Sequence, residues 1–353
     1  MSEMTATRIG AGATLLTLWL AAAWLLWRTS VPAGLHAPHV AAGDLFAAGE
    51  LARLRHHDAV LRWLWLAETL AGLGAVGLVA RRPPRRLQVA VELVALWLAR
   101  LPFDLAAHGW QRGAGIARSG YLEWLLARLP LELAVLVAIC GLAWLLARRV
   151  PRAAAPALAV LATATVLLQP LAGSGHRIAP NLYVEKVSDR TRLANAEAIG
   201  AGPTRRIVLW DTLLRFPRDE VRFVIAHERT HLARHHILKG LAWFLLLALP
   251  LLWPLSRLTA PRALLAALCL QLALLLLANT ISRRYEREAD WQALQRTHDP
   301  AAAERLFVRF ARTSLDDPDP PLAWKLLLAD HATTVERVAL ANARNKAATG
   351  ANR

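Results

Sequence analysis

Long apolar runs recur along the 353-residue chain and alternate with short polar links. An α-helix rises 1.5 Å per residue, so about 17 to 25 mostly apolar residues cross the ~30 Å hydrocarbon core of a bilayer. Seven segments approach or meet this length: 9–27, 63–80, 87–107, 130–147, 153–171, 240–255 and 263–281. The pattern therefore predicts a multi-pass membrane protein with about seven transmembrane helices.

Three of these segments contain glutamates, namely Glu68, Glu92 and Glu132. An ionisable side chain that faces lipid is costly, so such residues usually face protein or a wet cavity. We interpret the three glutamates as facing the interior of the helix bundle. The alternative is a structural carboxylate that is paired or that reaches the membrane surface.

The composition agrees with this class and narrows the partners. Of all residues 56% are hydrophobic, and the mean hydropathy is +0.32. The net charge of +16 comes mainly from arginines, clustered at 81–86 and 147–152 beside apolar segments, which suits anionic lipid headgroups. We expect membrane lipid as a partner and no nucleic acid, because no nucleic-acid-binding motif accompanies the charge. Cys140 and Cys269 lie inside apolar segments and indicate no disulfide framework.

Polar residues gather in two pieces, 172–236 and 282–353. The two apolar segments between them bring the chain back to the same side of the membrane, so both pieces can build one site. This divides the chain into a five-helix membrane region (1–171), a small β element with a helix (172–236), a transmembrane hairpin (237–281) and a C-terminal helical region (282–353). Short strands are expected at 181–187, 194–200 and 205–210, where β-prone residues lie between turn signals.

A histidine-rich helix follows these strands. Pro217 and the acidic Asp219 and Glu220 are typical of a helix N-terminus. Further along, His227-Glu228-Arg229-Thr230-His231 places two histidines four residues apart, so both imidazoles project from one helical face and can bind one metal ion. Glu228 lies one step round the helix and can reach a water on that metal. The alternative is a solvated basic helix end.

A third ligand is available in SRRYEREAD, residues 282–290. Glu286 and Asp290 are also four residues apart, so one carboxylate can bind metal while the other orients a ligand histidine. Catalytic zinc typically takes three protein ligands and leaves a fourth position for water. An exposed charged helix would explain these charges but not their spacing.

These motifs, in this order, resemble the type I CAAX prenyl endopeptidase family of integral-membrane zinc metalloproteases and its bacterial relatives. Residues 193–214 and 329–340 are similar to two further stretches of that family. Arg229 and Ala332 depart from the family pattern. The resemblance implies an all-α multi-pass membrane protein with a small α+β zinc metalloprotease domain of the gluzincin type, holding one Zn²⁺ per chain.

The resemblance also implies roles for individual residues. It makes His227, His231 and Glu286 the zinc ligands, as the spacing had indicated. It makes Glu228 the general base and places Asp290 behind a ligand histidine.

Three further residues are assigned to the substrate cleft by the resemblance. Asn195, on an edge strand, helps to hold the substrate backbone, and His331 and Arg337 line the cleft. We expect His331 to act in catalysis as a hydrogen-bond donor to the transition state. For His236, and for His235 beside it, a structural hydrogen bond is favoured over a fourth zinc ligand. His56, His57 and His108 have no partner visible in the sequence.

The function expected is zinc-dependent hydrolysis of peptide bonds in a peptide or membrane-protein substrate. Alternatives are a membrane quality-control protease of the heat-shock type, a β-lactam-sensor-like transducer protease, and a non-catalytic scaffold. The short region after Asp290 argues against the sensor, and the intact motifs argue against the scaffold. We expect the site to face the cytoplasm of a bacterial cell, although the arginine clusters at 81–86 and 147–152 would then face outward, against the positive-inside tendency. We make no prediction of oligomeric state.

Overall fold

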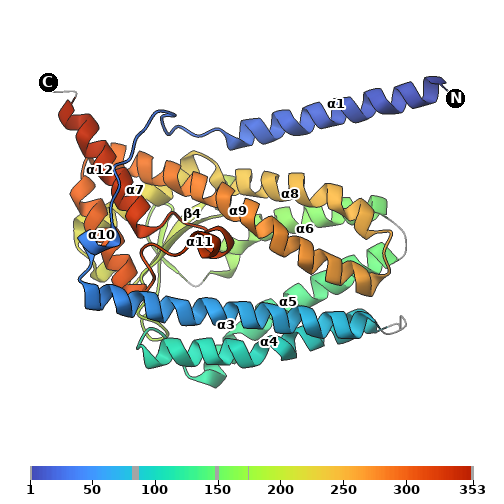
Figure 1. Ribbon diagram of the computed structural model, residues 1–353, viewed down its shortest axis with the longest axis horizontal. Helices are drawn as coiled ribbons and strands as arrows, with labels where there is room; N and C mark the ends of the chain where they lie inside the picture. Colours follow the sequence, from blue (N-terminus) through green and yellow to red (C-terminus); the bar gives the residue numbers. More distant parts are fainter. Residues whose placement is uncertain (1, 82–86, 148–150, 174, 351–353) are drawn as a thin grey trace.

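The computed structural model, which describes residues 2–81, 87–147, 151–173 and 175–350, is mostly helical and contains one small sheet (Figure 1). This agrees with the predicted combination of a helical protein and a small α+β element. The helices are α1 (Ser2–Trp27), α2 (Ala42–Leu45), α3 (Ala48–Ala80), α4 (Gln88–Gly113), α5 (Tyr121–Ala147), α6 (Pro151–Ala172), α7 (Arg218–Ala233), α8 (His236–Leu255), α9 (Ala260–Thr297), α10 (Pro300–Ser314), α11 (Leu322–Leu328) and α12 (Thr334–Gly350).

Every predicted apolar segment lies in a helix. The segment 87–107 begins one residue before its helix, α4, and the others lie entirely within theirs. Within the described residues, three helices are long and apolar enough to cross a membrane: α3, α8 and the Pro261–Thr297 stretch of α9. Shorter apolar stretches lie in α1 and α6, at Gly12–Trp27 and Pro156–Pro170. Length and composition thus support a membrane protein, while the number of seven spans stays a prediction.

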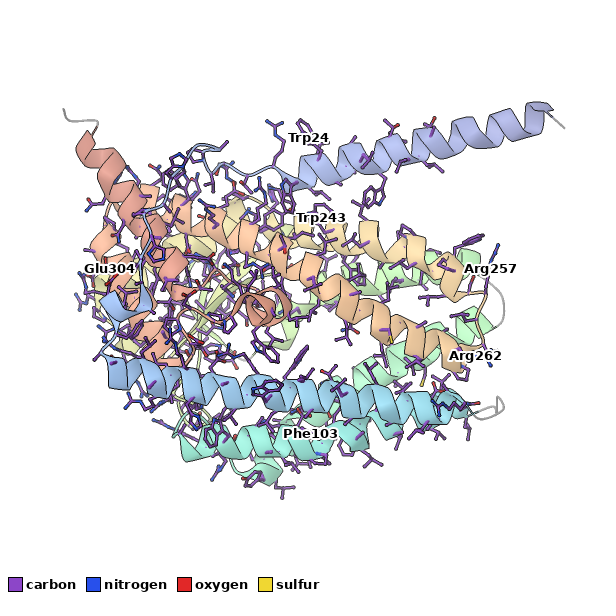
Figure 2. The ribbon with its side chains drawn as sticks, in the orientation of Figure 1. Trp24, Phe103, Trp243, Arg257, Arg262 and Glu304 are labelled. Carbon is purple, nitrogen blue, oxygen red and sulfur yellow. The ribbon has the colours of Figure 1, made fainter. Side chains whose placement is uncertain are left out.

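The long helices run roughly along one axis, and the polar elements gather at one end of them (Figure 1). Helices α3 and α4, α5 and α6, and α8 and α9 pack against each other as neighbours. Arg257 and Arg262 mark the far end of the α8–α9 hairpin, whereas Glu304 on α10 lies at the opposite end (Figure 2). The two polar pieces of the sequence therefore meet at one end of the bundle, as predicted.

A mixed sheet lies at that end, with the strand order β1-β2-β4-β3. Its strands are β1 (His176–Ala179), β2 (Leu182–Glu185), β3 (Ala196–Ile199) and β4 (Arg206–Trp210). β2 runs parallel to β4, and β3 pairs antiparallel with β4 and forms one edge of the sheet. The strands expected at 181–187, 194–200 and 205–210 correspond to β2, the edge strand β3 and β4, whereas β1 was not predicted.

The main hydrophobic core joins the sheet to α7, α9, α10 and α12. Phe223 of α7 and Phe307 of α10 meet edge to face with ring centroids 5.6 Å apart. Pro217 caps α7, with Asp219 and Glu220 in its first turn, as expected. Arg309 donates two hydrogen bonds, of 2.7 and 3.1 Å, to the buried Glu220 carboxylate. This anchoring fixes the helix that carries the histidine motif.

Glu68 and Glu92 are buried within the bundle, as interpreted, whereas the Glu132 side chain is 26% exposed. Arg100 pairs with the buried Glu68, and Glu132 accepts hydrogen bonds from Trp97 at 2.7 Å and Arg128 at 2.9 Å. These two are paired structural carboxylates. Glu92 is fully buried, and its oxygens have no hydrogen-bond partner within the described part of the chain. Residues 82–86 and 148–150, which hold most of the two arginine clusters, lie outside the described residues.

Candidate active site

Helices α7 and α9 pack face to face and bring the three predicted ligands together. His227 Nε2 lies 3.0 Å from His231 Nε2 and 3.2 Å from Glu286 Oε2, and His231 Nε2 lies 3.4 Å from Glu286 Oε1. Donor atoms at ~2.0 to 2.1 Å from a tetrahedral zinc ion would lie about 3.3 Å from one another. The triangle of donor atoms therefore has the size that a zinc ion requires.

The chemistry of the three donors also fits a cation. Although burial lowers it, hydrogen bonding to Asp290 and to Glu286 raises the pKa of His227 to about 10, so a proton occupies this position when no metal does. Burial lowers the pKa of His231 to about 3, which keeps that ring neutral. Glu286 is buried, and its Oε2 lies 3.2 Å from Nε2 of both His227 and His331. Two imidazoles and a carboxylate thus converge on a point that needs positive charge.

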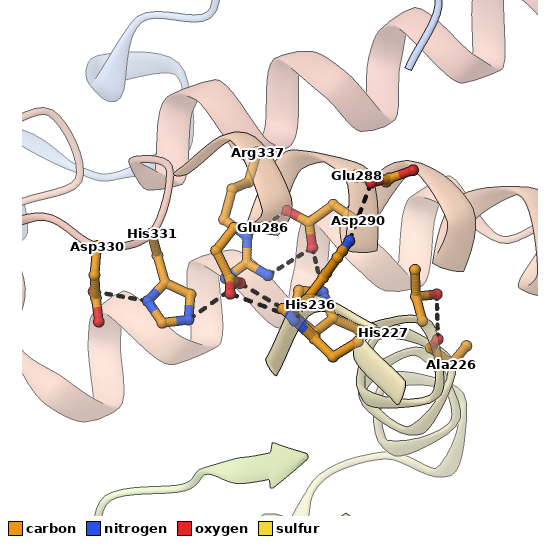
Figure 3. Close-up of polar contacts among 11 residues, drawn as sticks. Ala226, His227, His236, Glu286, Glu288, Asp290, Asp330, His331 and Arg337 are labelled. Carbon is orange, nitrogen blue, oxygen red and sulfur yellow. Dashed lines mark hydrogen bonds and ion pairs between the residues drawn. The ribbon is translucent and has the colours of Figure 1, made fainter. Parts of the chain in front are cut away.

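Asp290 holds His227 from behind, as the sequence suggested. His227 Nδ1 lies 2.9 Å from Asp290 Oδ1, so this nitrogen carries the proton and Nε2 is left to bind metal. Arg337 of α12 donates two hydrogen bonds to the same carboxylate, of 2.8 and 2.7 Å (Figure 3). Arg337 also lines the cleft, as the resemblance implied, and its role in binding substrate stays a prediction.

Glu228 lies beside the donor triangle on the wall of the cleft. Its side chain is buried, and desolvation raises its pKa to about 7. A general base works best with a pKa near the working pH. The position of Glu228 and its raised pKa are compatible with the expected role of a general base.

His331 reaches the same centre from the loop between α11 and α12. Its Nε2 lies 3.2 Å from Glu286 Oε2, and its Nδ1 lies 2.8 Å from Asp330 Oδ1 (Figure 3). Burial lowers the pKa of His331, but the nearby Glu286 and Asp330 raise it above the usual value overall. The side chain is 53% exposed, so the ring can present an N–H to a molecule in the cleft. Asp330 was given no role in the sequence analysis.

The cleft in front of these residues has a volume of about 480 Å³. Asn195 lines it immediately before the edge strand β3, and its backbone carbonyl accepts a hydrogen bond of 2.9 Å from Trp210 N–H. The Asn195 side chain is exposed next to the edge strand β3, and an extended peptide can add a strand to such an edge. Asp58, Arg62 and Asp316 line the cleft as well, and the sequence analysis did not identify them.

Arg229, which departs from the usual metal motif, lies on the opposite face of α7. It is exposed and borders a separate surface hollow together with Arg218, Arg222 and Arg296. The residue therefore leaves the donor triangle undisturbed. Ala332, the second departure, lies in the cleft wall between His331 and α12.

His236 also belongs to this region and makes structural hydrogen bonds, as the sequence favoured. Its ring contacts both His231 and Glu288, which is buried on α9. A helix turns 100° per residue, so position 288 faces away from the side shared by 286 and 290. Residues four apart share one helical face, and this rule identified Glu286 and Asp290 but not Glu288. The sequence feature that pointed to Glu288 was His236, a histidine five residues after His231 with no assigned partner.

Two histidines on one helix and a glutamate on a helix later in the chain form the donor set that is typical of metallopeptidases. Residues 164–345 match the model of peptidase family M48, and the chain belongs to that family. The match confirms the resemblance drawn from the motifs and the expected enzyme class.

Two individual proteins are similar to this chain. An uncharacterized metalloprotease, YhfN of Bacillus subtilis (strain 168), is 30% identical over 48% of this chain and 45% of its own length. The match thus spans about half of that relative. The crystal structure of S. mikatae Ste24p matches 94% of this chain and 97% of its own, with a TM-score of 0.67 and 16% identity. The second similarity shows that the two proteins share a fold.

Proposed function

We propose that this chain is an integral-membrane, zinc-dependent endopeptidase with His227, His231 and Glu286 as the ligands of one zinc ion. The observation that carries the proposal is the triangle of donor atoms, 3.0 to 3.4 Å apart, beside a buried glutamate at the end of an open cleft. When bound, zinc supplies Lewis acidity, which lowers the pKa of water toward ~7 and polarises a carbonyl oxygen.

Side chains of the protein supply proton transfer, stabilisation of the developing charge, substrate binding and positioning of the ligands. Glu228 accepts a proton from the attacking water and passes it to the amine that leaves. His331 donates an N–H to the oxygen on which negative charge develops. The free edge of β3 pairs with the substrate backbone, and Asn195 holds it at the end of that strand. Asp290, gripped by Arg337, keeps His227 in the required tautomer.

The direct test is metal content together with hydrolysis of an unstructured peptide by the purified full-length protein. We expect about one zinc per chain, loss of zinc in Glu286→Ala, and retention of zinc with loss of hydrolysis in Glu228→Ala. Hydrolysis that survives Glu228→Ala, or zinc retained at wild-type level by Glu286→Ala, would overturn the assignment.

The substrate is proposed to be a peptide or a segment of a membrane protein, presented from the bilayer that the apolar helices occupy. Prenylated peptides and misfolded membrane proteins are the two classes to compare. Trapping with Glu228→Ala, followed by identification of the bound polypeptides, separates them. A lipid-modified C-terminal peptide in the trap favours the first class, and a varied set of membrane-protein fragments favours the second.

We also propose a multi-pass bacterial membrane protein whose site faces the cytoplasm. Arg257 and Arg262 at the far end of the α8–α9 hairpin would then face outward, like the clusters at 81–86 and 147–152. Single cysteines introduced at positions 258 and 350 of a variant lacking the native cysteines test this orientation. Labelling of position 350 by a membrane-impermeant reagent in intact cells would reverse it.

A further inference from the structure

Behind His231, on the side away from the donor triangle, lies a chain of buried polar contacts. His231 Nδ1 lies 3.1 Å from His236 Nδ1, and His236 Nε2 lies 3.0 Å from Glu288 Oε2. His236 is 5% exposed and Glu288 is 2% exposed. The His236 ring stacks on Tyr285, with centroids 4.7 Å apart and planes 13° from parallel. These contacts link the second ligand histidine to α9, and Figure 3 shows the contact between His236 and Glu288.

The donors around Glu288 fix it as a carboxylate. Its Oε1 accepts hydrogen bonds from Ser30 N–H at 2.7 Å and from Ser30 O–H at 2.6 Å, and Arg234 Nε lies 3.4 Å away. Gln292 in turn donates to Ser30 Oγ at 2.9 Å. An ionised carboxylate can only accept hydrogen bonds, so His236 Nε2 must be the donor to Glu288.

The direction of the remaining hydrogen bonds then follows from the valence of imidazole. A neutral ring carries one N–H and one lone pair. Because His236 donates from Nε2, its Nδ1 accepts, and His231 Nδ1 must donate to it. His231 Nε2 is then left with its lone pair directed at His227 and Glu286. Both nitrogens of His236 are engaged away from the donor triangle, which excludes it as a fourth ligand in this arrangement.

We propose that Glu288 and His236 form a positioning pair that fixes the tautomer and orientation of His231 for metal binding, as Asp290 does for His227. The proposal rests on the proposed zinc site and extends it to residues outside the ligand set. It also ties the segment after α1 to the metal centre, because Ser30 supplies two of the hydrogen bonds that hold Glu288. Each ligand histidine is thus held from behind by a carboxylate, directly for His227 and through a second imidazole for His231.

The competing explanation is that His236 only fills space and stacks on Tyr285. Two variants separate these roles. His236→Phe keeps an aromatic ring for stacking but removes both nitrogens. His236→Gln loses the ring, yet its amide can accept from His231 and donate to Glu288, which preserves the direction of the hydrogen bonds.

The measurement is the zinc dissociation constant of the full-length protein, obtained by competition with a chromogenic chelator. Loss of a residue that orients a metal ligand typically costs 10- to 100-fold in affinity, so we expect a loss of about this size in His236→Phe. His236→Gln should recover most of the affinity. The neighbouring His235→Asn is the control and should bind as the wild type does, because His235 is exposed with φ 57° and asparagine tolerates that conformation.

Wild-type affinity in His236→Phe, or equal losses in the phenylalanine and glutamine variants, would overturn the positioning role. Glu288→Gln breaks the other end of the pair without changing its size, and it serves if His236→Phe does not fold. It should also weaken zinc binding, and unchanged affinity would contradict the proposal. Retention of zinc by Glu286→Ala would instead refute the zinc site itself, so the two failures are distinguishable.

Discussion

Two buried glutamates lie on packed helices in different regions of the molecule. Glu286 lies on α9 and faces α7, and Glu92 lies on α4, which packs against α3. Glu286 is 8% exposed and Glu92 is 0% exposed, and neither side-chain oxygen of Glu92 has a hydrogen-bond partner within the described residues. Around Glu286, however, three imidazoles lie within 3.4 Å of the carboxylate, from His227, His231 and His331. Among the described residues, no group within ion-pairing distance approaches Glu92.

The difference shows that burial of a carboxylate does not by itself mark a functional site. A lone buried carboxyl group can avoid the cost of charge by staying protonated. A carboxylate surrounded by convergent nitrogen donors is different, because its charge and theirs are suited to a shared cation. The three glutamates of the apolar segments looked equally notable in the sequence, and Glu68 and Glu132 also proved to be paired structurally.

The largest expected effect comes from one isosteric change made in both regions. Glu228→Gln should lower kcat by about 10² to 10⁴-fold, because the amide cannot accept the proton of the attacking water. Glu92→Gln makes the same chemical change in the bundle and should leave kcat unaltered. Peptide hydrolysis by the two purified variants, with zinc content measured in parallel, checks both. A large loss in Glu92→Gln would mean that the bundle carboxyl group takes part in the reaction.

The second-largest effect is expected at His331, whose half-exposed imidazole lies beside Glu286. His331→Ala removes a donor to the developing oxyanion and should lower kcat by about 10²-fold with little change in KM. Zinc content should not change. His331→Gln keeps an N–H donor and should recover part of the rate. Near-wild-type kcat in the alanine variant would remove His331 from catalysis.

The third prediction compares the two ligand histidines through pH. In the metal-free protein His227 has a pKa of about 10, so its proton must leave before zinc binds, whereas His231 has a pKa of about 3 and is already neutral. Zinc affinity should therefore fall by about tenfold per pH unit as the pH is lowered, corresponding to one proton rather than two. The slope is best measured between about pH 5.5 and 6.5, below the ~7 at which water on zinc ionises.

The same experiment should be done with Glu228→Gln, which removes the titration of Glu228 near pH 7. Zinc affinity should fall, and not rise, as the pH is lowered, because low pH favours the protonated form of His227 and the proton competes with the metal. A slope of two protons would show that a second imidazole also releases a proton, either His231, contrary to the effect of its burial, or His331, whose pKa is raised by Glu286. Repeating the measurement with His331→Ala separates the two.

Substrate binding at the edge strand should be affected less. Asn195→Ala removes side-chain hydrogen bonding at the end of β3, and one hydrogen bond is worth ~0.5 to 1.5 kcal/mol. We expect kcat/KM for a peptide to fall by about 2- to 10-fold with zinc retained. Unchanged kinetics would place the substrate backbone elsewhere in the cleft.

These comparisons also separate what the sequence could predict from what it could not. His227 and His231 were found because helical periodicity alone places residues four apart on one face. Glu286 and Asp290 were found by the same rule, and their meeting with α7 required only that the α8–α9 hairpin return to the same side. The strands were located by composition, except the short β1, which the sequence analysis did not recognise.

The partners across elements were beyond the sequence. Arg337 lines the cleft, as expected, but no local rule showed that the packing of α12 on α9 also brings its guanidinium to Asp290. Glu288 and Ser30 are 258 positions apart, and no local rule connects them. Tertiary packing chooses which of several compatible charges will meet, and this choice decides whether a residue binds substrate or holds its neighbour.

The smallest expected effect concerns the ion pair in the bundle. Arg100→Met leaves Glu68 without its partner, but Arg100 is 46% exposed, so the loss should be nearer the ~1 kcal/mol of an exposed pair than the cost of breaking a buried one. For a chain of this size we expect Tm to fall by about 1 to 2 °C in detergent. Adding Glu68→Gln should restore much of the stability, because it removes the unpaired charge, and a double-mutant cycle measures the coupling. Glu92→Gln is the reference, since that carboxyl group has no hydrogen-bond partner to lose among the residues that the structure describes. A fall in Tm for Glu92→Gln as large as that for Arg100→Met would mean that Glu92 is held by an interaction of its own, and the contrast between the two helix pairs would then be one of degree.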